Sequence, residues 1–342
     1  MLDVASAVRA VLAGVTPLAT ETIALRDARG RVLGADVFAG RPLPGFDHAA
    51  MDGYAARAAE LPATLAVTGA IAAGEDLARG ELAVPAGSRL GAGELGLLAA
   101  LGVAEVTVSR APRVALIATG DELVDIATVP GPGQLVDSSA HMLAALVRDA
   151  GGEPSYLGIA RDDRATVAAM ITRGLAYDVV ITTGGVSVGD RDHVRAALAS
   201  AGVDLELYKV AMKPGKPFSF GMNGQENRSI PVFGLPGNPV STLVAFELFV
   251  RPALLAMQGA ATARPSAPVV LADPYRKPAG RAHYLRARAV RDGDRLVAHL
   301  HPKQGSAMLS SLIGCNALVA IAADVTEVGA GQLAPALLLE AV

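Results

Sequence analysis

The stretch from Thr182 to Val194 reads Thr-Thr-Gly-Gly-Val-Ser-Val-Gly-Asp-Arg-Asp-His-Val and concentrates glycines, hydroxyls and carboxylates. The apolar run before it, Asp178 to Ile181, predicts a buried parallel strand, and the pattern from His193 to Ala201 predicts a helix. Glycines let the backbone approach a ligand, and successive N–H groups at such a turn attract anions. Asp190 or Asp192 could hold a divalent metal against a phosphate. Alternatively, the glycines only shape a turn and Asp192 only caps the helix.

Two further loops carry groups suited to an anion. Lys213 and Lys216 lie in a proline-stiffened turn, Lys-Pro-Gly-Lys-Pro, where pre-ordered cations favour a polyanion, although both could simply be solvated surface lysines. Gly-Leu-Pro-Gly-Asn-Pro (234–239) precedes a helical pattern and lacks the Gly-Lys-Ser/Thr ending of a Walker loop. Carboxylates repel an anion, so they can share its binding site only if a metal ion bridges them. The residues therefore predict a phosphate-bearing ligand, held by glycine loops and lysines, with a magnesium-type ion on aspartates.

The elements that position these loops alternate between strand and helix from Arg113 to about residue 257. This alternation predicts a three-layer α/β domain with a mostly parallel sheet. Ligands of such sheets bind outside the carboxyl ends of the strands, so the polar loops are expected to converge on one site. The residues that follow predicted strands include Asp121, Glu122, Asp162, Asp163, Lys213, Lys216 and Asn238.

The flanking regions have other patterns. Residues before 110 combine an amphipathic helix from Val4 to Val15 with short strands and a helix over 91–101, which predicts an N-terminal mixed helical/β linker domain. A proline-rich joint, Arg264 to Pro268, precedes several short strands and the hairpin signal Asp292-Gly293-Asp294. These features predict a small β-barrel-like C-terminal domain.

Composition narrows the class of protein. A length of 342 residues favours two or three domains. The net charge of −3 shows no block of like charge, so no nucleic-acid partner is expected, and no apolar run is long enough to predict a membrane span. No zinc-ligand spacing and no Ser/His/Asp order is present. The single cysteine, Cys315, fits a reducing cytoplasm.

Taken together, these residues resemble the molybdopterin molybdenumtransferase family, which comprises bacterial MoeA and the E domain of gephyrin. The matching runs follow the family order across nearly the whole chain: Pro-Gly-Phe-Asp-His-Ala-Ala-Met-Asp-Gly-Tyr-Ala (44–55), Gly-Glu-Asp-Leu (74–77), Pro-Ala-Gly-Ser-Arg-Leu (85–90), Thr-Gly-Asp-Glu-Leu (119–123), Gly-Ile-Ala-Arg-Asp-Asp (158–163), Thr-Gly-Gly-Val-Ser-Val-Gly (183–189), Lys-Pro-Gly-Lys-Pro-Phe (213–218) and Leu-Pro-Gly-Asn-Pro-Val-Ser (235–241).

The resemblance implies insertion of molybdenum from molybdate into adenylylated molybdopterin, with magnesium's help and release of AMP. It matches five acids to the family's active cleft: Asp52, Asp76, Glu122, Asp162 and Asp192. The metal is expected on Asp190, Asp192 and Glu122. It implies that substrate binds Thr119, Gly120, Asp121, Ser138, Thr183, Gly184, Gly185, Ser187, Lys213, Gly215, Lys216, Pro236, Gly237, Asn238, Pro239, Ser241, Arg281 and Ser306, with Arg286 as a further weak match beside the cleft.

The same resemblance implies a domain organisation and partners. Residues 1–45 and 78–110 would form the linker and dimerisation domain, 46–77 the remnant of a mobile second domain, 111–260 the molybdopterin-binding domain and 265–342 the C-terminal β domain. The family forms elongated dimers, which would place Asp52 and Asp76 in the neighbouring subunit's cleft. Further partners would be a molybdopterin adenylyltransferase and the recipient molybdoenzymes.

The chain departs from the family between Tyr54 and Pro85, where it is several dozen residues shorter than usual. Within that stretch, Ala72 and Ala73 stand where arginines are usual, and elsewhere His48, Ala49 and Ser139 replace the usual Asn, Ser and Asn. Three functions follow as alternatives. The first is a compact molybdenumtransferase, the second a non-catalytic carrier or sensor of molybdopterin, and the third, weaker, a molybdopterin adenylyltransferase.

Overall fold

The computed structural model describes residues 1–47, 64, 72–185, 193–225 and 228–340. It contains two compact units. The larger comprises Met1–Pro17, Ala111–Met257 and Ala261–Val342, and the smaller comprises Leu18–Arg110 with Gln258–Ala260.

A six-stranded sheet forms the centre of the larger unit, with the strand order β10-β12-β13-β9-β5-β8. The pairs β13–β9, β9–β5 and β5–β8 are parallel, whereas β12 is antiparallel to both neighbours. Because the central strands are covered on both faces, β5 and β9 read as nearly continuous buried apolar runs. The strands are β5 (Arg113–Thr119), β8 (Glu153–Ala160), β9 (Val179–Thr183), β10 (Val203–Tyr208), β12 (Ser219–Gln225) and β13 (Arg228–Leu235).

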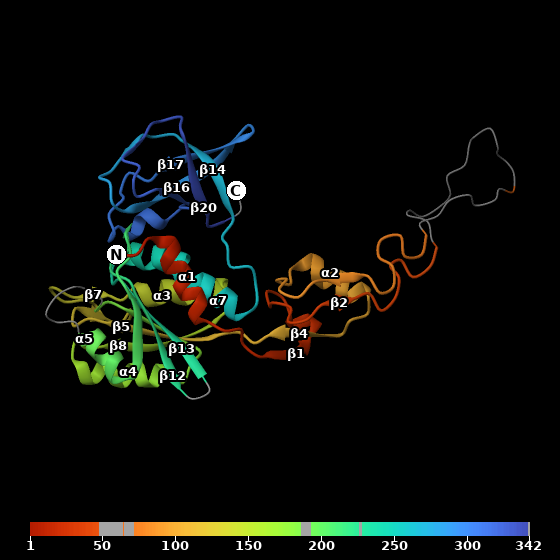
Figure 1. The fold of residues 1–342 in the computed structure, drawn as a ribbon, viewed down its shortest axis with the longest axis horizontal. Coiled ribbons are helices and arrows are strands. Elements are labelled where there is room, and N and C mark those ends of the chain that lie inside the picture. Colours follow the sequence, from red (N-terminus) through yellow and green to blue (C-terminus); the bar gives the residue numbers. More distant parts are fainter. Residues whose placement is uncertain (48–63, 65–71, 186–192, 226–227, 341–342) are drawn as a thin grey trace. The chain divides into compact units, whose positions relative to one another are not determined.

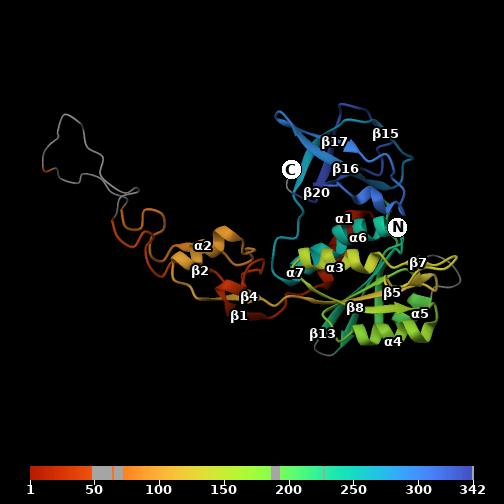
Figure 2. The same ribbon diagram turned by 180° about the vertical axis from the view of Figure 1, so that it is seen from behind.

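Helices cover both faces of this sheet (Figures 1 and 2). On one face, α4 (Arg164–Gly174) and α5 (His193–Ser200) pack over a core that includes Ile117, Val180 and Val232. On the other face lie α1 (Val4–Gly14), α3 (Ser139–Asp149) and the long helix that follows β13. The three-layer α/β domain predicted from the sequence is therefore confirmed.

The long helix comprises α6 (Pro239–Ala245), a π-helical turn η3 (Phe246–Val250) and α7 (Arg251–Met257). Pro252 has no N–H to donate, and just before it the N–H of Arg251 bonds the carbonyl of Phe246, five residues back. In the described part of the chain, Pro239–Met257 is the one helix long and apolar enough to cross a membrane, but 83% of its most apolar window is buried. It is a core helix of the fold.

The C-terminal region is a closed barrel of five strands (Figure 1). The strands follow the order β16-β17-β14-β20-β18, and β18 pairs back onto β16. Alanines alternate into the interior, for example Ala287, Ala289 and Ala336, which suits a barrel this narrow. The predicted hairpin at Asp292–Asp294 is confirmed, with Asp292 opposite Arg295. The strands are β14 (Ser266–Leu271), β16 (Ala282–Asp292), β17 (Arg295–Leu300), β18 (Ala317–Ile321) and β20 (Leu333–Leu338).

A sixth strand links the barrel to the α/β domain. The short β11 (Met212–Lys213) pairs in parallel with β16, so that Lys213 lies in register with His283. Beside the barrel, β15 (Tyr275–Arg276) pairs with β19 (Glu327–Val328), and a short 3-10 helix, η4, spans Leu309–Leu312.

The smaller unit combines a helix with short strands, whereas the first helix, α1, which the sequence predicts as part of this region, belongs to the larger unit. The smaller unit contains a 3-10 turn, η1 (Leu25–Asp27), the helix α2 (Ala92–Ala100) and two strand pairs around a core of Leu33, Leu90, Leu98 and Val108. The antiparallel pairs are β1 (Thr20–Ala24) with β4 (Glu105–Ser109), and β2 (Val37–Phe38) with β3 (Leu82–Val84).

Candidate functional site

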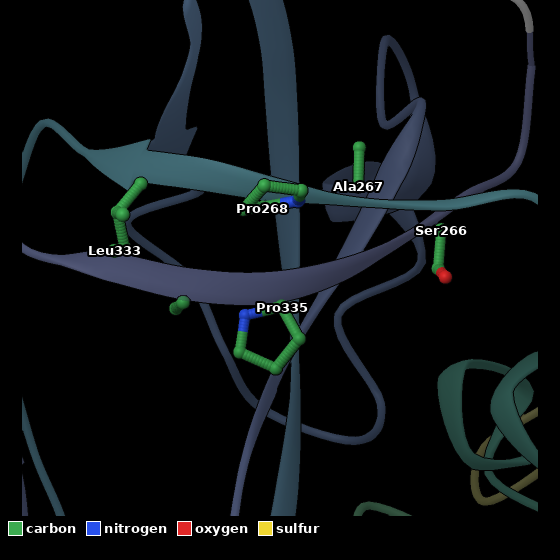
Figure 3. Close-up of a pocket in the computed structure, with 6 residues that line it drawn as sticks. Ser266, Ala267, Pro268, Leu333 and Pro335 are labelled. Carbon is green, nitrogen blue, oxygen red and sulfur yellow. The ribbon is translucent and has the colours of Figure 1, made fainter.

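The barrel carries a cavity of about 350 Å³ between β14 and β20 (Figure 3). It is lined by Ser266, Ala267, Pro268, Leu333, Ala334 and Pro335. Pro268 faces Pro335 in the ladder, and proline has no N–H to close it. Since the lining has no charged side chain, this cavity does not suit a phosphate, and the candidate site lies elsewhere.

Polar loops gather instead where the strands of the α/β sheet end, as the sequence predicts. The loops follow four parallel neighbours, β5, β8, β9 and β13, whose carboxyl ends share one edge of the sheet. The predicted site residues described along this edge are Thr119, Gly120, Asp121, Glu122, Asp162, Thr183, Gly184, Gly185, Pro236, Gly237, Asn238, Pro239 and Ser241. Ser138 precedes α3, where its side chain makes no capping bond.

The glycine loops lie in direct contact at this edge. Gly184 has a φ of +84° and donates its N–H to the carbonyl of Leu235 over 3.1 Å. A Cβ on Gly184 would lie 2.4 Å from the carbonyl oxygen of Thr119, and a Cβ on Gly237 would lie 3.5 Å from the Cα of Gly184. These backbones can approach only because side chains are absent.

The buried threonines at the strand ends hold the strands together. Oγ1 of Thr119 donates to the carbonyl of Thr183 over 3.0 Å, and Oγ1 of Thr182 donates to the carbonyl of Phe233 over 3.4 Å. Because the Thr119 proton is committed to this bond, its hydroxyl is left to accept hydrogen bonds from a ligand.

The acidic loops after β5 and β8 are tied to each other. Oδ1 of Asp121 accepts the N–H of Asp162 over 3.1 Å, and Arg161 donates to the carbonyl of Asp121 over 2.9 Å. Asp163 caps α4 through the N–H of Thr166. Glu122 and Asp162 are exposed and form no ion pair with another described residue. Their carboxylates are therefore available to a ligand or a hard cation.

The lysine turn is anchored on both sides while its charges stay uncompensated. The N–H of Val210 donates to the carbonyl of Lys216 over 3.1 Å, and the N–H of Ala282 in the barrel donates to the carbonyl of Ala211 over 2.9 Å. Gly215 has a φ of +98°, and the Lys213–Pro214 peptide is cis. Both lysine side chains are exposed and lack an ion pair within the described residues. The anchored turn thus presents two cations that have no ion pair in the part of the chain that the structure describes.

The barrel adds a cluster of basic residues beside Lys213. His283 is buried, and its Nδ1 lies 2.8 Å from the hydroxyl of Tyr275. Burial, and then the neighbouring cations Lys213, Lys277 and Arg281, lower the pKa of His283 to about 4. The imidazole is therefore neutral at neutral pH. Lys277 is also buried, which lowers its pKa, and it donates to the carbonyls of Arg281 and Ala323 at 3.0 and 3.2 Å.

Ser306 brings a barrel loop to the start of α6. Its carbonyl accepts the N–H of Val240 over 3.2 Å, and its hydroxyl lies 3.3 Å from the side-chain nitrogen of Asn238. Arg281 belongs to the barrel turn that Lys277 holds. The structure therefore brings together the α/β loops, the lysine turn and Ser306.

The remaining predicted residues are not among those described at this edge. Ser187, Asp190, Asp192 and Asp52 are outside the described residues. Asp76 belongs to the smaller unit, where its N–H donates to the carbonyl of Leu43 over 3.1 Å. Asp47, in the same unit, accepts the N–H of Ala73 over 2.8 Å, and this hydrogen bond holds the two residues together.

Three polar residues near the site were not predicted from the sequence: Lys277, His283 and Gln304. His283 lies in β16, but nothing in the sequence marks it as buried among cations. Gln304 lies in a loop, and its main partner, Arg286, is 18 residues away in the sequence, so no local signal identifies it.

Three families match successive parts of the chain. Residues 2–72 match the MoeA N-terminal region (domain I and II), residues 115–256 a probable molybdopterin binding domain, and residues 268–339 the MoeA C-terminal region (domain IV).

Curated proteins and solved structures are similar over almost the whole length. Molybdopterin molybdenumtransferase 2 of Mycobacterium tuberculosis is 35% identical over 381 aligned positions, covering 91% of this chain and 93% of that protein. Molybdopterin molybdenumtransferase 1 of the same organism is 31% identical over 399 positions, covering 91% and 92%. The molybdopterin biosynthesis MoeA protein of Pyrococcus horikoshii superposes with a TM-score of 0.81 at 25% identity, over 99% of this chain and 100% of that one. A molybdenum cofactor biosynthesis protein of Pyrococcus furiosus gives a TM-score of 0.74 at 27% identity, over 99% of each chain.

The aligned lengths of 381 and 399 positions exceed the 342 residues of this chain. The mycobacterial relatives therefore contain residues that this chain lacks.

Proposed function

The chain belongs to the molybdopterin molybdenumtransferase family, and we propose that it inserts molybdenum from molybdate into adenylylated molybdopterin and releases AMP. The observation that carries the proposal is the convergence of glycine loops with carboxylates and lysines that have no ion pair among the described residues, on one edge of the α/β sheet. Both substrates are anions, and an edge of this kind suits them.

The described residues divide into three roles in this reaction. Lys213, Lys216 and Arg281 attract the phosphate and molybdate oxygens. The close-packed backbones around Gly184 and Gly237 let the pterin phosphate approach main-chain N–H groups. Ser138, Ser306 and Asn238 supply uncharged hydrogen bonds, which orient the substrate without adding charge.

Magnesium fits the donor set of this edge. The carboxylate of Glu122 is exposed and unpaired in the described chain, and carboxylate oxygens are the ligands that Mg²⁺ prefers. No group of three His, Cys, Asp or Glu side chains placed for a metal occurs within the described ranges, so the proposed set of Glu122, Asp190 and Asp192 depends on two residues beyond them. Bound there, the ion would offset the charge on the phosphate as AMP leaves.

A turnover assay tests the proposal. Purified protein with adenylylated molybdopterin, molybdate and magnesium is expected to release AMP, measured by chromatography. Omitting molybdate or magnesium supplies the matched control. Release no faster than in buffer would refute the enzymatic function.

A carrier or sensor of molybdopterin is the second candidate, because the chain lacks residues present in its mycobacterial relatives. This function predicts tight binding of adenylylated molybdopterin without AMP release. Calorimetry alongside the turnover assay separates the two candidates.

We further propose a homodimer in which Asp52 and Asp76 complete the partner's cleft, with the domain boundaries given by the resemblance. Coexpression of an Asp76→Asn chain with a Lys213→Ala chain tests this arrangement. Shared clefts would restore up to half of the sites in the mixed dimer, whereas self-contained subunits would stay inactive. A molybdopterin adenylyltransferase and recipient molybdoenzymes are the proposed macromolecular partners.

A further inference from the structure

The barrel loop of residues 301–306 continues the edge of β16 after β17 has ended. The last residue pair between these strands is Ala287 with Leu300. The main chain of Arg286 therefore lies one position beyond the ladder, on the edge that faces β17. Buried main-chain groups need partners, and this loop supplies them.

At this position the side-chain amide of Gln304 makes the hydrogen bonds that a neighbouring strand would otherwise make. Its Oε1 accepts the N–H of Arg286 over 3.1 Å, and its Nε2 donates to the carbonyls of Arg286 and His301 at 2.9 and 2.8 Å. The N–H of His301 also donates to the Arg286 carbonyl over 2.9 Å. One amide side chain thereby fixes both groups of Arg286 and the first residue of the loop.

The side chain of Arg286 holds the same loop from the other direction. Its Nη2 donates to the carbonyls of Lys303 and Gly305 at 2.8 and 3.2 Å. The guanidinium is completely buried, and its Nε and Nη1 have no partner among the described residues. Gln304 and Arg286 thus form a reciprocal clamp, in which each side chain binds main-chain groups of the other's segment.

Ser306 follows the clamp directly. It is the residue that meets Asn238 and Val240 at the start of α6. Because Gly305 is held by Arg286, the clamp supports the position of Ser306 in addition to its own two contacts. A loop displacement of 1 Å at a binding residue can cost on the order of a hundredfold in rate.

We propose that Gln304 is a positioning residue, which with Arg286 holds Ser306 against the start of α6 and so keeps the barrel side of the site in place. Gln304 touches no substrate in this role, and its effect passes through Ser306. The part of the proposal that concerns catalysis rests on the proposed molybdenumtransferase function.

The first experiment does not depend on activity. The N–H of Val240 bonds the carbonyl of Ser306, so its hydrogen exchange, followed by NMR, reports whether the barrel loop is in place. Gln304→Leu, which removes all three side-chain bonds, is expected to speed exchange at Val240 about tenfold or more. Gln332→Leu is the matched control, because Gln332 also bonds a main-chain N–H in the barrel, that of Gly329 at 2.7 Å, but outside this loop. Unchanged exchange in Gln304→Leu would overturn the proposal.

The second experiment measures AMP release. Gln304→Leu is expected to lower kcat/KM by about 10- to 100-fold, and Gln332→Leu to leave it unchanged. In a Ser306→Ala background, Gln304→Leu is expected to add less than about twofold, because Gln304 affects turnover through the Ser306 hydroxyl, which is already absent. Multiplicative losses would show that Gln304 acts independently of Ser306.

A variant that keeps part of the clamp covers the case in which Gln304→Leu does not fold. Gln304→Glu retains an acceptor for the Arg286 N–H but loses the donor, so intermediate exchange at Val240 is expected. Wild-type exchange at Val240 in this variant would also overturn the proposal. If the wild-type protein releases no AMP, the proposed function fails, while Val240 exchange still decides the role of Gln304.

Discussion

The side-chain nitrogen of Asn238 lies 3.3 Å from the hydroxyl of Ser306, although 68 residues separate them in the chain. Asn238 ends the loop after β13, and Ser306 ends a loop of the barrel. Together with the pairing of Lys213 and His283, this contact joins the two parts of the larger unit at the candidate site. The site is therefore shared between the α/β domain and the barrel.

Gly184 is expected to tolerate no side chain. Gly184→Ala would bring a Cβ to 2.4 Å from the Thr119 carbonyl at a φ of +84°, so both a clash and backbone strain arise. We expect the free energy of unfolding in urea to fall by about 3 kcal/mol or more. Gly133→Ala is the control, because Gly133 has a φ of +77° with open space around it, and about 1 kcal/mol is expected there. Equal losses of unfolding free energy in Gly184→Ala and Gly133→Ala would show that backbone strain, and not the clash with Thr119, sets the cost.

The lysine turn is expected to set affinity rather than stability. Lys213→Ala and Lys216→Ala each remove an exposed cation that has no ion pair in the described chain, so binding of molybdate, measured by calorimetry, should weaken about tenfold or more. The melting temperature should barely change. Arg173→Ala, an exposed cation in the last turn of α4, is the control and should bind molybdate normally. Normal molybdate affinity in both lysine variants would mean that the two are only solvated surface residues.

Asp47 is expected to affect AMP release by holding the loop that carries Asp76 in place. Asp47→Ala removes the acceptor of the Ala73 N–H and should lower AMP release about tenfold, with a stability loss of about 1 kcal/mol. Asp36→Ala removes a similar exposed bond, to the N–H of Ala86 at 2.7 Å, and should cost similar stability without affecting turnover. Asp47→Asn, which keeps an acceptor, should retain activity. Equal turnover in the two alanine variants would contradict the positioning of Asp76 by Asp47.

The buried His283 is expected to give the fold a pH dependence. Its pKa is lowered from 6.5 to about 4, so between these values the unfolded chain binds a proton that the folded chain does not. The contribution of His283 to the free energy of unfolding is complete above pH 6.5. It falls by about 3 kcal/mol in total as the pH drops towards 4. Urea unfolding from pH 7 to pH 4 measures this slope.

His283→Gln should flatten that slope, because the group that titrates is gone. His299→Gln, at an exposed position of β17, should preserve it. A slope that persists in His283→Gln would assign the pH dependence to other groups.

Much of the fold follows from local pattern. Alternation of buried strands and amphipathic helices between Arg113 and Met257 predicted the three-layer domain, and Asp292-Gly293-Asp294 predicted the barrel hairpin. These features are readable because hydrophobic periodicity and turn chemistry act over a few residues. The order of polar loops after successive strands also predicted where the site residues gather, since parallel strands end at one edge.

Contacts between distant segments could be decided only by the tertiary structure. The sequence by itself identified the loops that are suited to ligand binding, because these loops contain the glycines, lysines and carboxylates. It contained no signal that Gln304 completes the edge of β16 or that His283 lies among three cations. Nor did it show that Arg286 is buried with two nitrogens that lack a partner among the described residues. Each of these properties arises when chain segments far apart meet and exclude water, and burial of that kind is a property of the packed fold rather than of any local stretch.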